Sequence, residues 1–366
     1  MARVLLLSLA PERGGAEVVI EQVAQRLDRA RLTPVLGPAA DSPLMRRWQT
    51  EGFEVLDGLT LPRWKRLDQI WLAVRALRRA IVSANIDIVY THGVAAHILG
   101  GRAAASLGLP AVWHVHDVFE SRLSADGVLH RLAAATPSRR IIAVSDTVAT
   151  SLLSHVDRAR LTVIPNGVSA EHVTPVEWPD SRPRVVWCGR LQPWKGAHVF
   201  LRVARRVHER HADARFVIVG DALFGIDSGY PAQLRADVRA WGLGHVVEFV
   251  GHVPDARPWL AAATTVVHCS VKPEPFGLVV AEAMMQMRPV VAYARGGPGE
   301  MLREGAGVVV APDDEAALAE GIRRILDEPN LARGTGARAR ERACLHYEVG
   351  RMSADVEKML LSTQSG

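Results

Sequence analysis

Two glutamates with seven residues between them carry the clearest chemical signal in the sequence. Glu274 follows an apolar strand pattern through a proline-bearing loop, and Glu282 falls within the next predicted helix. A carboxylate accepts two hydrogen bonds side by side, which matches the vicinal hydroxyls of a sugar ring or a ribose. Between them, Phe276-Gly277 can present backbone N–H groups to a phosphate. One ligand with a sugar, a diphosphate and a ribose would use the whole segment, and the alternative is one capping and one surface glutamate.

A second loop supplies positive charge. Arg190 and Lys195 lie between a predicted strand, Arg184–Cys188, and a predicted helix, Gly196–Arg210, so both can reach one point near a helix N-terminus. Two such cations suit a diphosphate, because each charge-assisted hydrogen bond contributes roughly 1.5–3 kcal/mol. A solvated surface pair is the alternative.

Glycines and histidines mark further strand ends in the first half. Gly14-Gly15 opens the first predicted helix, where glycine lets backbone N–H groups approach a ligand closely, although glycine before a helix is also ordinary. His114 and His116 fall on one face of a predicted strand by the strand period of two, and His116 is a candidate active-site residue. His92 ends another predicted strand and is a lesser candidate. A structural role is the alternative for each histidine.

The composition excludes several classes of protein. Hydrophobic residues make up 48% of the chain and charged residues 23%, which is typical of a globular protein and of neither a disordered nor a collagen-like one. No apolar run reaches the ~18 residues that a membrane span needs, and the apolar run at the N-terminus is too short for a signal peptide. The cysteines Cys188, Cys269 and Cys344 show no metal-ligand spacing. We therefore expect a soluble, cytoplasmic protein without a disulfide framework.

The net charge of +5 lies entirely in the first half. Residues 1–170 hold 20 Lys/Arg and 15 Asp/Glu, whereas residues 171–366 hold 24 of each. This mild excess permits an anionic substrate or a membrane surface but does not indicate nucleic-acid binding. The segment from Arg63 to Arg79 combines arginines with Trp64 and Trp71 on an amphipathic helix, which could lie on anionic lipid or simply pack on the sheet.

Short β-branched apolar runs alternate with longer stretches of helical period, which predicts βα units and parallel sheets. The predicted strands of the first half are Val4–Leu9, Leu32–Leu36, Phe53–Leu56, Asp87–Thr91, Ala111–His116, Arg140–Val144 and Leu161–Ile164. The predicted helices of the first half include Ala16–Leu27 and Leu67–Ser83. Residues 169–183 contain three prolines and no clear period, so we expect a linker there.

The alternation restarts at residue 184 and predicts a second domain. Its predicted strands are Arg184–Cys188, Arg215–Val219, Val246–Val250, Thr265–His268, Pro289–Tyr293 and Gly307–Val310. We expect an α/β chain with an N-terminal Rossmann-like domain over 1–168, a linker over 169–183 and a C-terminal Rossmann-like domain over 184–345. Residues 346–366 are expected to form a closing helix that could pack back on the first domain. Ligands of open parallel sheets bind beyond the carboxyl ends of the strands, where the candidate residues fall.

In their order and spacing, these motifs resemble the retaining nucleotide-sugar glycosyltransferases of family 4, whose E-x7-E motif matches Glu274 and Glu282. Further matching segments run through nearly the whole chain: Gly14–Glu17, Ile164–Val168, Gly189–Leu191, Lys195-Gly196, Val219–Asp221, Phe249–Gly251 and Gly296–Glu300. The resemblance implies the GT-B architecture, in which two doubly wound parallel-sheet domains face each other across a cleft. The first domain would bind the acceptor and the second the nucleotide sugar.

The resemblance also implies roles for single residues. Glu282 would hold the donor ribose, Glu274 would bind the transferred sugar near its C3 hydroxyl, and Arg190 and Lys195 would bind the diphosphate. The remaining implied donor contacts are Gly15, Gly189, Gly220, His252, Val253, Phe276, Gly277 and Leu278. The implied acceptor-side residues are Gly14, Gly15, His92 and His116. Within these sets, the predicted catalytic residues are His116, Glu274, Arg190 and Lys195.

The activity implied is the transfer of a hexose-type sugar from a UDP- or GDP-sugar to an acceptor hydroxyl on a glycan, a glycolipid or a secondary metabolite. Configuration at the anomeric carbon would be retained, and no cofactor would be needed. The sequence has no Asp-x-Asp signature for a metal-bridged diphosphate, so protein cations and the helix N-terminus after Gly277 are expected to stabilise the leaving group. A nucleotide-sugar epimerase, a phosphorylase-like enzyme and a non-catalytic sugar-nucleotide binder remain as alternatives. The expected place is the bacterial cytoplasm, with peripheral contact at the inner face of the membrane left open.

One position departs from the family pattern. Family members usually have glycine in the turn before the Pro289–Tyr293 strand, whereas this chain has Arg288. If that position needs a positive φ, arginine costs on the order of 1 kcal/mol there, and a changed turn shape is the alternative.

Overall fold

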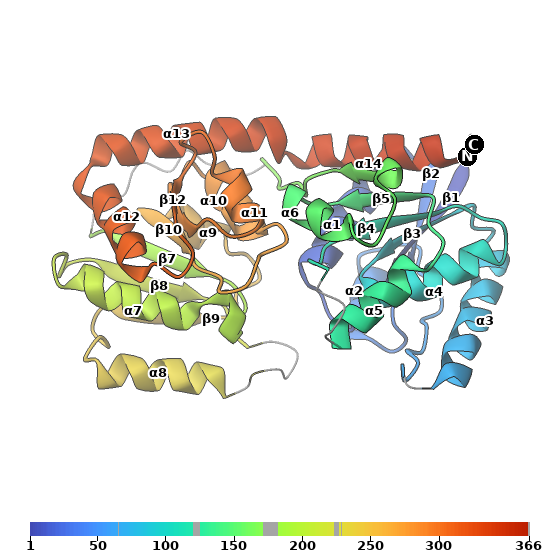
Figure 1. Cartoon of the computed structure of the whole chain (residues 1–366), viewed down its shortest axis with the longest axis horizontal. Coiled ribbons are helices and arrows are strands. Elements are labelled where there is room, and N and C mark those ends of the chain that lie inside the picture. Colours follow the sequence, from blue (N-terminus) through green and yellow to red (C-terminus); the bar gives the residue numbers. More distant parts are fainter. Residues whose placement is uncertain (65, 120–124, 171–181, 223–226, 228, 365–366) are drawn as a thin grey trace. The chain divides into compact units, whose positions relative to one another are not determined.

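The chain forms two compact units, unit 1 from Met1–Gly167 with Val349–Gly366 and unit 2 from Val168–Glu348. The computed structural model describes residues 1–64, 66–119, 125–170, 182–222, 227 and 229–364. Most of the predicted linker, residues 171–181, lies outside the described residues. Each unit is built on a parallel sheet that carries helices on its faces (Figure 1).

The sheet of unit 1 has six parallel strands in the order β2-β1-β3-β4-β5-β6. The strands are β1 (Ala2–Ser8), β2 (Leu32–Gly37), β3 (Ile88–His92), β4 (Ala111–Val115), β5 (Arg140–Ala143) and β6 (Leu161–Val163). The helices are α1 (Gly15–Arg26), α2 (Pro43–Thr50), α3 (Leu67–Ser83), α4 (Val94–Ala105), α5 (Ala125–Ala134), α6 (Asp146–Leu152) and α14 (Val349–Gln364).

Strand β1 shows why the sequences of the strands are nearly continuous apolar runs. Leu5 and Leu7 belong to a core cluster with residues of α3 and α4, whereas Val4 and Leu6 belong to a second cluster with residues of α1 and α14. A strand covered by helices on both faces buries apolar side chains on both, so its sequence is a nearly continuous apolar run. Helix α14, at the end of the chain, thus completes the core on the α1 side of this sheet.

The sheet of unit 2 also has six parallel strands, in the order β12-β11-β10-β7-β8-β9. The strands are β7 (Arg184–Cys188), β8 (Arg215–Val219), β9 (Val247–Gly251), β10 (Thr265–His268), β11 (Val290–Tyr293) and β12 (Val308–Val310). The helices are α7 (Ala197–His208), α8 (Tyr230–Ala240), α9 (Arg257–Ala261), α10 (Leu278–Met285), α11 (Gly297–Met301), α12 (Glu315–Asp327) and α13 (Pro329–His346).

Both sheets contain a point where the direction of strand addition reverses. In unit 1 the chain leaves β1 for β2 on one side and returns to β3 on the other. In unit 2 it leaves β7 for β8 and β9, then returns to β10 on the opposite side of β7. The loops at the carboxyl ends of these paired strands diverge, which opens a crevice for a ligand in doubly wound sheets. The predicted α/β, doubly wound class is confirmed for each unit.

Two local predictions need correction. Phe53–Leu56 is not a strand, because its pairing with the sheet is limited to a single parallel bridge between Val55 and Leu36. In the turn before β11, the positive φ falls on Met287, at 56°, and not on Arg288. Arg288 is buried, and its backbone N–H donates to the carbonyl of Ala283 at 3.0 Å. Methionine therefore adopts the left-handed conformation in this turn, and Arg288 does not carry the expected backbone strain.

Among the described residues, none of the helices is long and apolar enough to cross a membrane.

Candidate functional site

A cluster of polar side chains lies at the carboxyl ends of β7 and β10, at the reversal point of the unit 2 sheet. Lys195 comes from the loop after β7, and Glu274 comes from the loop after β10. The ammonium Nζ of Lys195 lies 2.5 Å from Oε2 of Glu274, although 79 residues separate them in sequence. The side chains are 18% and 10% exposed, so this is a largely buried ion pair. Two of the predicted catalytic residues are thus brought together.

Other polar groups complete the surroundings of Glu274. Ser270 donates a hydrogen bond to Oε2 of Glu274 at 3.4 Å, and Nε2 of His268 lies 3.5 Å from the same oxygen. The ammonium of Lys195 lies over the indole of Trp194, with Nζ 4.2 Å from the ring centroid. The indole N–H of Trp194 in turn donates to the side-chain oxygen of Gln192 at 3.1 Å. Both members of the ion pair are therefore fixed from a second side.

The electrostatics of the pair favour ionised Glu274. Burial alone would raise its pKa, because it penalises the charged form. The charge of Lys195 and the hydrogen bond and charge of His268 outweigh burial and lower the pKa far below the ordinary value. A carboxylate that stays ionised at any physiological pH is a constant acceptor for hydroxyl groups.

Glycines allow the Glu274 loop to pass close to its neighbour. The N–H of Gly297 donates to the carbonyl of Glu274 at 2.9 Å, and Glu274 forms a parallel bridge with Gly296. Gly296 has φ of 70°, and a Cβ at this position would lie 2.2 Å from the Glu274 carbonyl oxygen. Gly277 has φ of 98° and caps the N-terminus of α10, which begins at Leu278. The carboxylate of Glu274 and the free N–H groups at the start of α10 thus lie on one short loop.

Glu282 and Arg190 lie in the same part of the unit. Glu282 is half-buried on α10, and its negative charge acts on Cys188 at the end of β7: burial first and then Glu282 raise the pKa of this thiol to about 12. The charge of Glu282 also acts on Arg257. Arg190 follows Cys188 by two positions and is half-buried in the loop that carries Lys195. Both residues therefore lie at the carboxyl end of β7.

The remaining predicted donor residues follow β7, β8 and β9 in turn. The N–H of Gly189 donates to Val219 at 3.0 Å, and the N–H of Gly220 donates to Gly251 at 2.8 Å. Gly220 has φ of 128°, and a Cβ there would lie 1.9 Å from the carbonyl oxygen of Gly189. Only glycine allows this approach of two strand ends. His252, which is exposed, and Val253 follow directly after β9.

In unit 1, Gly14 and Gly15 lie at the N-terminus of α1 as predicted, but the contact of Gly14 is internal. Its N–H donates to Oε2 of Glu17 at 2.9 Å, and the hydroxyl of Ser8 donates to Oε1 of Glu17 at 2.7 Å. Glu17 is 6% exposed. This carboxylate already satisfies the Gly14 amide, so the Gly15 backbone, which is exposed, is the part of the motif open to a ligand.

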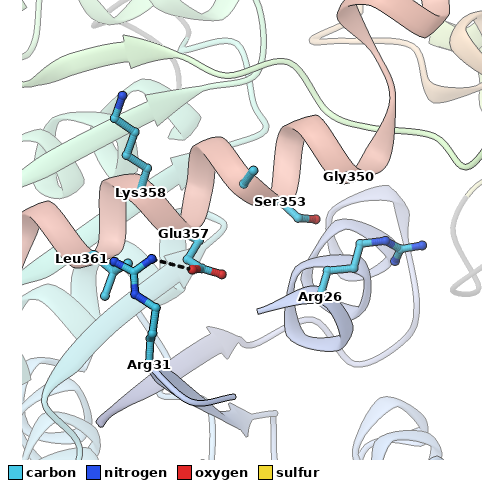
Figure 2. Close-up of a pocket in the computed structure, with 8 residues that line it drawn as sticks. Arg26, Arg31, Gly350, Ser353, Glu357, Lys358 and Leu361 are labelled. Carbon is cyan, nitrogen blue, oxygen red and sulfur yellow. Dashed lines mark hydrogen bonds and ion pairs between the residues drawn. The ribbon is translucent and has the colours of Figure 1, made fainter. Parts of the chain in front are cut away.

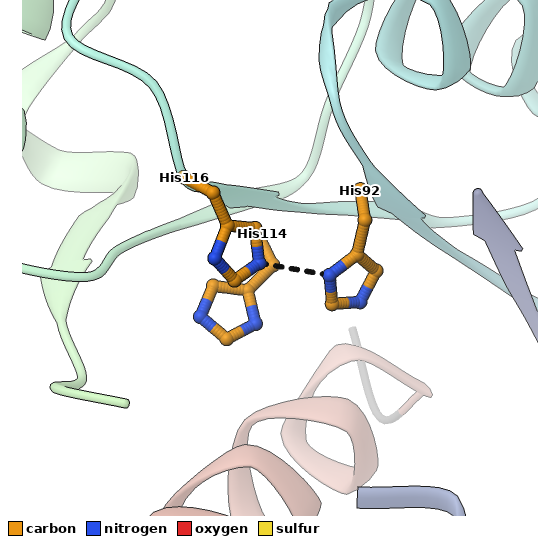
Figure 3. A group of neighbouring side chains, drawn as sticks. All are labelled: His92, His114 and His116. Carbon is orange, nitrogen blue, oxygen red and sulfur yellow. Dashed lines mark hydrogen bonds between the residues drawn. The ribbon is translucent and has the colours of Figure 1, made fainter. Parts of the chain in front are cut away.

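His92 and His116 meet at the carboxyl ends of β3 and β4. His92 pairs in register with His114 across the two strands, and His116 lies two residues beyond His114 on the same face. Nδ1 of His92 is 2.9 Å from Nε2 of His116, and Nδ1 of His114 is 2.5 Å from the hydroxyl of Tyr90. Figure 3 shows the three imidazoles gathered where the two strands end.

Burial keeps these imidazoles neutral. It lowers the pKa of His116 to about 3, and it lowers the pKa values of His92 and His114 well below the ordinary value, with the neighbouring histidines adding to the effect. Nε2 of His92 and Nε2 of His114 are buried without a hydrogen-bond partner among the described residues. The protein therefore leaves part of the hydrogen-bonding capacity of the cluster unused. Each unpaired buried polar group reduces the free energy of unfolding by about 1–3 kcal/mol.

Sequence reasoning missed His268, Ser270 and Tyr90. His268 ends the predicted strand Thr265–His268 and Ser270 follows it by two positions, so the end of that strand was the available signal. Tyr90 lies two residues before His92 on one strand face, which is the same signal in unit 1.

A pocket in unit 1 lies apart from these residues. It is lined by residues near the C-terminal end of α1 and along α14, among them Arg26, Ser353 and Lys358, and within it Arg31 pairs with Glu357 at 3.4 Å (Figure 2). Arg31 directly precedes β2, so the pocket lies at the amino ends of the strands. Ligand sites of doubly wound sheets occur at the opposite ends, and the pocket is not assigned to the candidate site.

Comparison with known proteins follows the division of the chain. Residues 13–172 match the family described as Glycosyltransferase Family 4, and residues 169–342 match the family described as Glycosyl transferases group 1. A D-inositol 3-phosphate glycosyltransferase of Catenulispora acidiphila is 31% identical over 289 residues, which cover 70% of this chain and 67% of the relative. A glycogen synthase of Mycobacterium tuberculosis H37Rv is 28% identical over 302 residues, which cover 76% of this chain and 70% of the relative.

A solved structure extends the likeness to the whole chain. The Anabaena protein Alr3699/HepE, crystallised in complex with UDP and glucose, superposes with a TM-score of 0.86 at 25% identity. The match covers 99% of this chain and 100% of that one. Two six-stranded parallel sheets with this likeness confirm the predicted GT-B architecture.

Proposed function

The chain belongs to the glycosyltransferases of family 4 and group 1, and from this premise we propose that it moves a hexose from a UDP-sugar to an acceptor hydroxyl with retention of the anomeric configuration. The observation that carries the proposal is the buried Lys195–Glu274 pair at the reversal point of the unit 2 sheet. The choice of UDP among nucleotides is supported by HepE, whose structure holds UDP and glucose.

The diphosphate is proposed to bind between Lys195 and the start of α10. Lys195 and Arg190 supply positive charge, and the N–H groups after Gly277 supply hydrogen-bond donors at the positive end of the helix dipole. Negative charge grows on the diphosphate as the bond to the sugar breaks, so these groups stabilise the transition state more than the bound substrate. No protein nucleophile is assigned. The oxygen of the acceptor hydroxyl attacks the anomeric carbon on the face from which the diphosphate departs, the bond between sugar and diphosphate breaks, and the hydroxyl proton passes to the departing phosphate oxygen.

Glu274 is proposed to bind a hydroxyl of the transferred sugar, because its carboxylate is ionised and lies beside the proposed phosphate site. Glu282 lies on helix α10, which directly follows the Glu274 loop, and is proposed to bind the ribose. Gly189, Gly220, His252 and Val253, which follow β7, β8 and β9, would then line the nucleoside end.

Unit 1 is proposed to bind the acceptor. Gly15, with Gly14 behind it, follows β1, and His92 and His116 follow β3 and β4. Neutral His116 can accept a hydrogen bond from a hydroxyl or donate one to it, which suits a glycan, glycolipid or metabolite acceptor. The acceptor itself is read by loops of this unit that differ in chemistry from one glycosyltransferase to another.

Donor binding and turnover test the proposal. UDP-glucose, UDP-galactose, UDP-N-acetylglucosamine, GDP-mannose and ADP-glucose are compared by thermal unfolding, since a ligand at 100 times its dissociation constant adds about 2.7 kcal/mol. A stabilising donor is then incubated with a panel of acceptors and analysed by NMR for the anomeric proton. Transfer with an α-linked product from an α-linked donor is the expected outcome. A converted donor without acceptor would indicate epimerisation, and no stabilisation by any donor would contradict the proposal.

We further propose that helix α3 contacts an anionic membrane surface. Its residues Leu77 and Ile81 are buried in the core, yet Leu67 and Trp71 are 79% and 59% exposed. Arg75, Arg78 and Arg79 line a shallow hollow on the same helix. Exposed apolar side chains beside arginines are the composition of an interfacial helix.

Vesicle sedimentation tests this contact. The chain should sediment with phosphatidylglycerol-containing vesicles at low salt and be released by 0.5 M salt, and Trp71→Gln should reduce the bound fraction severalfold. Leu345→Gln, at an exposed leucine of α13, is the matched control and should have no effect. Equal sedimentation of both variants, or none of the parent chain, would exclude α3 as a membrane surface.

A further inference from the structure

We propose that His92, His114 and His116 of unit 1 form a site for one transition-metal ion of the zinc class, held by one imidazole nitrogen from each residue. One ring nitrogen from each of the three lies within 4.8 Å of the other two. The three residues come from the neighbouring strand ends of β3 and β4 (Figure 3). Sequence spacing gave no metal motif, because the register of two strands, and not a local motif, assembles the set.

The geometry of the cluster is close to that of a three-histidine site. Zinc binds imidazole nitrogens at about 2.0–2.1 Å in a tetrahedron, so its nitrogen ligands lie roughly 3.3 Å apart. The contact between Nδ1 of His92 and Nε2 of His116, at 2.9 Å, holds two of the rings together, and one nitrogen from each of the three rings lies within 4.8 Å of the other two. Small rotations of the rings therefore bring the nitrogens to bonding distance without moving the strands.

The hydrogen bonds of the cluster also suit a cation. His92 and His116 share one contact, and whichever ring donates in it, Nε2 of His92 remains buried without a partner among the described residues, as does Nε2 of His114. Tyr90 holds Nδ1 of His114 by its hydroxyl, which fixes the orientation of the ring. Metal-binding histidines are oriented in this way by a partner on the second nitrogen.

The donor set selects the class of ion. Three neutral imidazoles favour zinc, cobalt, nickel or copper, whereas magnesium and calcium require oxygen ligands. Three protein ligands leave a fourth position for water or another small ligand. Because His116 is also the residue proposed to meet the acceptor, a bound metal ion would occupy that ring and block transfer reversibly. This consequence depends on the proposed function, but metal binding itself does not.

Cobalt titration tests the site directly. The full chain, freed of any polyhistidine tag and of nucleotide, is titrated with Co²⁺, and tetrahedral coordination is followed by its visible absorption. One equivalent should bind to the parent chain, and Zn²⁺ should displace it and raise the melting temperature. His92→Asn and His116→Asn should each weaken binding at least tenfold, since even the loss of a residue that orients a ligand costs about 10–100-fold in affinity.

Unit 2 offers matched controls. Nδ1 of His198 is 2.7 Å from the hydroxyl of Tyr230. This contact resembles the one between His114 and Tyr90, but among the described residues His198 belongs to no group of three potential metal ligands. Tyr90→Phe should weaken cobalt binding, whereas His198→Asn and Tyr230→Phe should leave it unchanged. Circular dichroism confirms that each variant is folded, and the conservative Tyr90→Phe carries the test if a histidine variant is not.

The results separate this site from the proposed activity. A chain that binds one cobalt ion through these residues but transfers no sugar would support the site and contradict the proposed function. Absence of cobalt absorption and of any zinc-dependent rise in melting temperature would overturn the site. Binding that is unchanged in His92→Asn, His116→Asn and Tyr90→Phe would overturn it as well, because the ion would then lie elsewhere.

Discussion

The two units have the same kind of sheet but opposite chemistry at the carboxyl ends of neighbouring strands. In unit 1 the neighbouring strand ends of β3 and β4 carry buried, neutral imidazoles. In unit 2 the neighbouring strands β7 and β10 are followed by loops that hold an ionised lysine–glutamate pair. Desolvation acts on both clusters, yet it prevails only where no opposite charge is close. The fold therefore brings titratable side chains together at the strand ends in both units. Whether these side chains are neutral or ionised depends on whether a group of opposite charge lies beside them.

The proposed division of substrates between the two units rests on this comparison. A permanent pair of charges suits a diphosphate and the hydroxyls of a sugar, whose binding groups are ionic or strongly polar. Neutral imidazoles suit a hydroxyl that must be positioned by hydrogen bonds, because each ring can donate one and accept one.

Removing the positive charge of unit 2 should have the largest effect. Lys195→Met keeps the length of the side chain but removes the ammonium, and turnover should fall by about 10²–10³, as when one oxyanion donor is removed. Lys272→Met is the control, because Lys272 is exposed on the loop after β10. Steady-state kinetics with the best donor measure both variants. A loss below about threefold in Lys195→Met would show that the ammonium does not stabilise the leaving group.

Acid should weaken unit 1 before unit 2. Burial lowers the pKa of His97 to about 3, so between that pH and about 6.5 the unfolded chain binds a proton that the folded chain does not. The free energy of unfolding is therefore unaffected by His97 above pH 6.5 and falls as the pH drops below it. By pH 4.5, His97 alone should reduce the free energy of unfolding by about 2.7 kcal/mol. For Glu274, whose folded pKa is depressed, the contribution is complete above about pH 4.5 and is lost only below it.

Hydrogen exchange resolved by mass spectrometry can separate the two units. After correction for the intrinsic rates, amides of β1, β3 and β4 should lose protection between pH 7.5 and 5, while those of β7 and β10 should keep it. A His97→Gln variant should show a smaller pH dependence in unit 1. Parallel loss of protection in both units, or greater loss in unit 2, would contradict the difference in charge.

Glycines at the strand ends of the two units should also differ in how well they tolerate a side chain. Gly220→Ala places a methyl group 1.9 Å from a carbonyl oxygen at φ of 128°, and should reduce the free energy of unfolding by about 1–3 kcal/mol. Gly14→Ala meets only the flexible Glu17 side chain at 3.0 Å with φ of −118°, and should change stability by less than about 1 kcal/mol. Urea unfolding of both variants gives the difference, and equal losses would show that the close approach in unit 2 is not required.

The smallest effect is expected at the turn before β11. Met287 has φ of 56°, which costs a residue with a Cβ about 1–2 kcal/mol, whereas asparagine tolerates this conformation better. Met287→Asn should therefore raise the free energy of unfolding by up to about 1 kcal/mol, because the 39% exposed methionine loses little packing. Thermal unfolding measures the change, with Met301→Asn, a buried methionine, as the destabilised counterpart. A destabilised Met287→Asn would place the strain elsewhere.

Much of the fold follows from local patterns. Strands such as β1 and β7 are covered on both faces, so their apolar runs are readable without knowledge of the sheet. Leu67–Ser83 is helix α3 with the predicted bounds, since its apolar period is regular. The segment Phe53–Leu56 was predicted wrongly because a short apolar run has the same pattern whether it joins a sheet or makes a single bridge.

The site was predictable only in part. Lys195 and Glu274 could be placed at strand ends, but their contact depends on the order of β7 and β10 in the sheet, which no local pattern contains. The same holds for the cluster in unit 1, where the register of β3 with β4 sets His92 opposite His114. His268 and Ser270 were missed because their role appears only when Glu274 lies beside them. The substrate roles of all these residues stay predictions.

Nucleotide affinity of the Lys195→Met variant tests the central claim most directly. Isothermal titration compares UDP with uridine in the parent chain, in Lys195→Met and in Lys272→Met. A charge-assisted contact to the diphosphate contributes about 1.5–3 kcal/mol, so Lys195→Met should bind UDP roughly 10–100-fold more weakly while its uridine affinity is unchanged. UDP affinity that is equal in the parent chain and in Lys195→Met would contradict a diphosphate site at the Lys195–Glu274 pair.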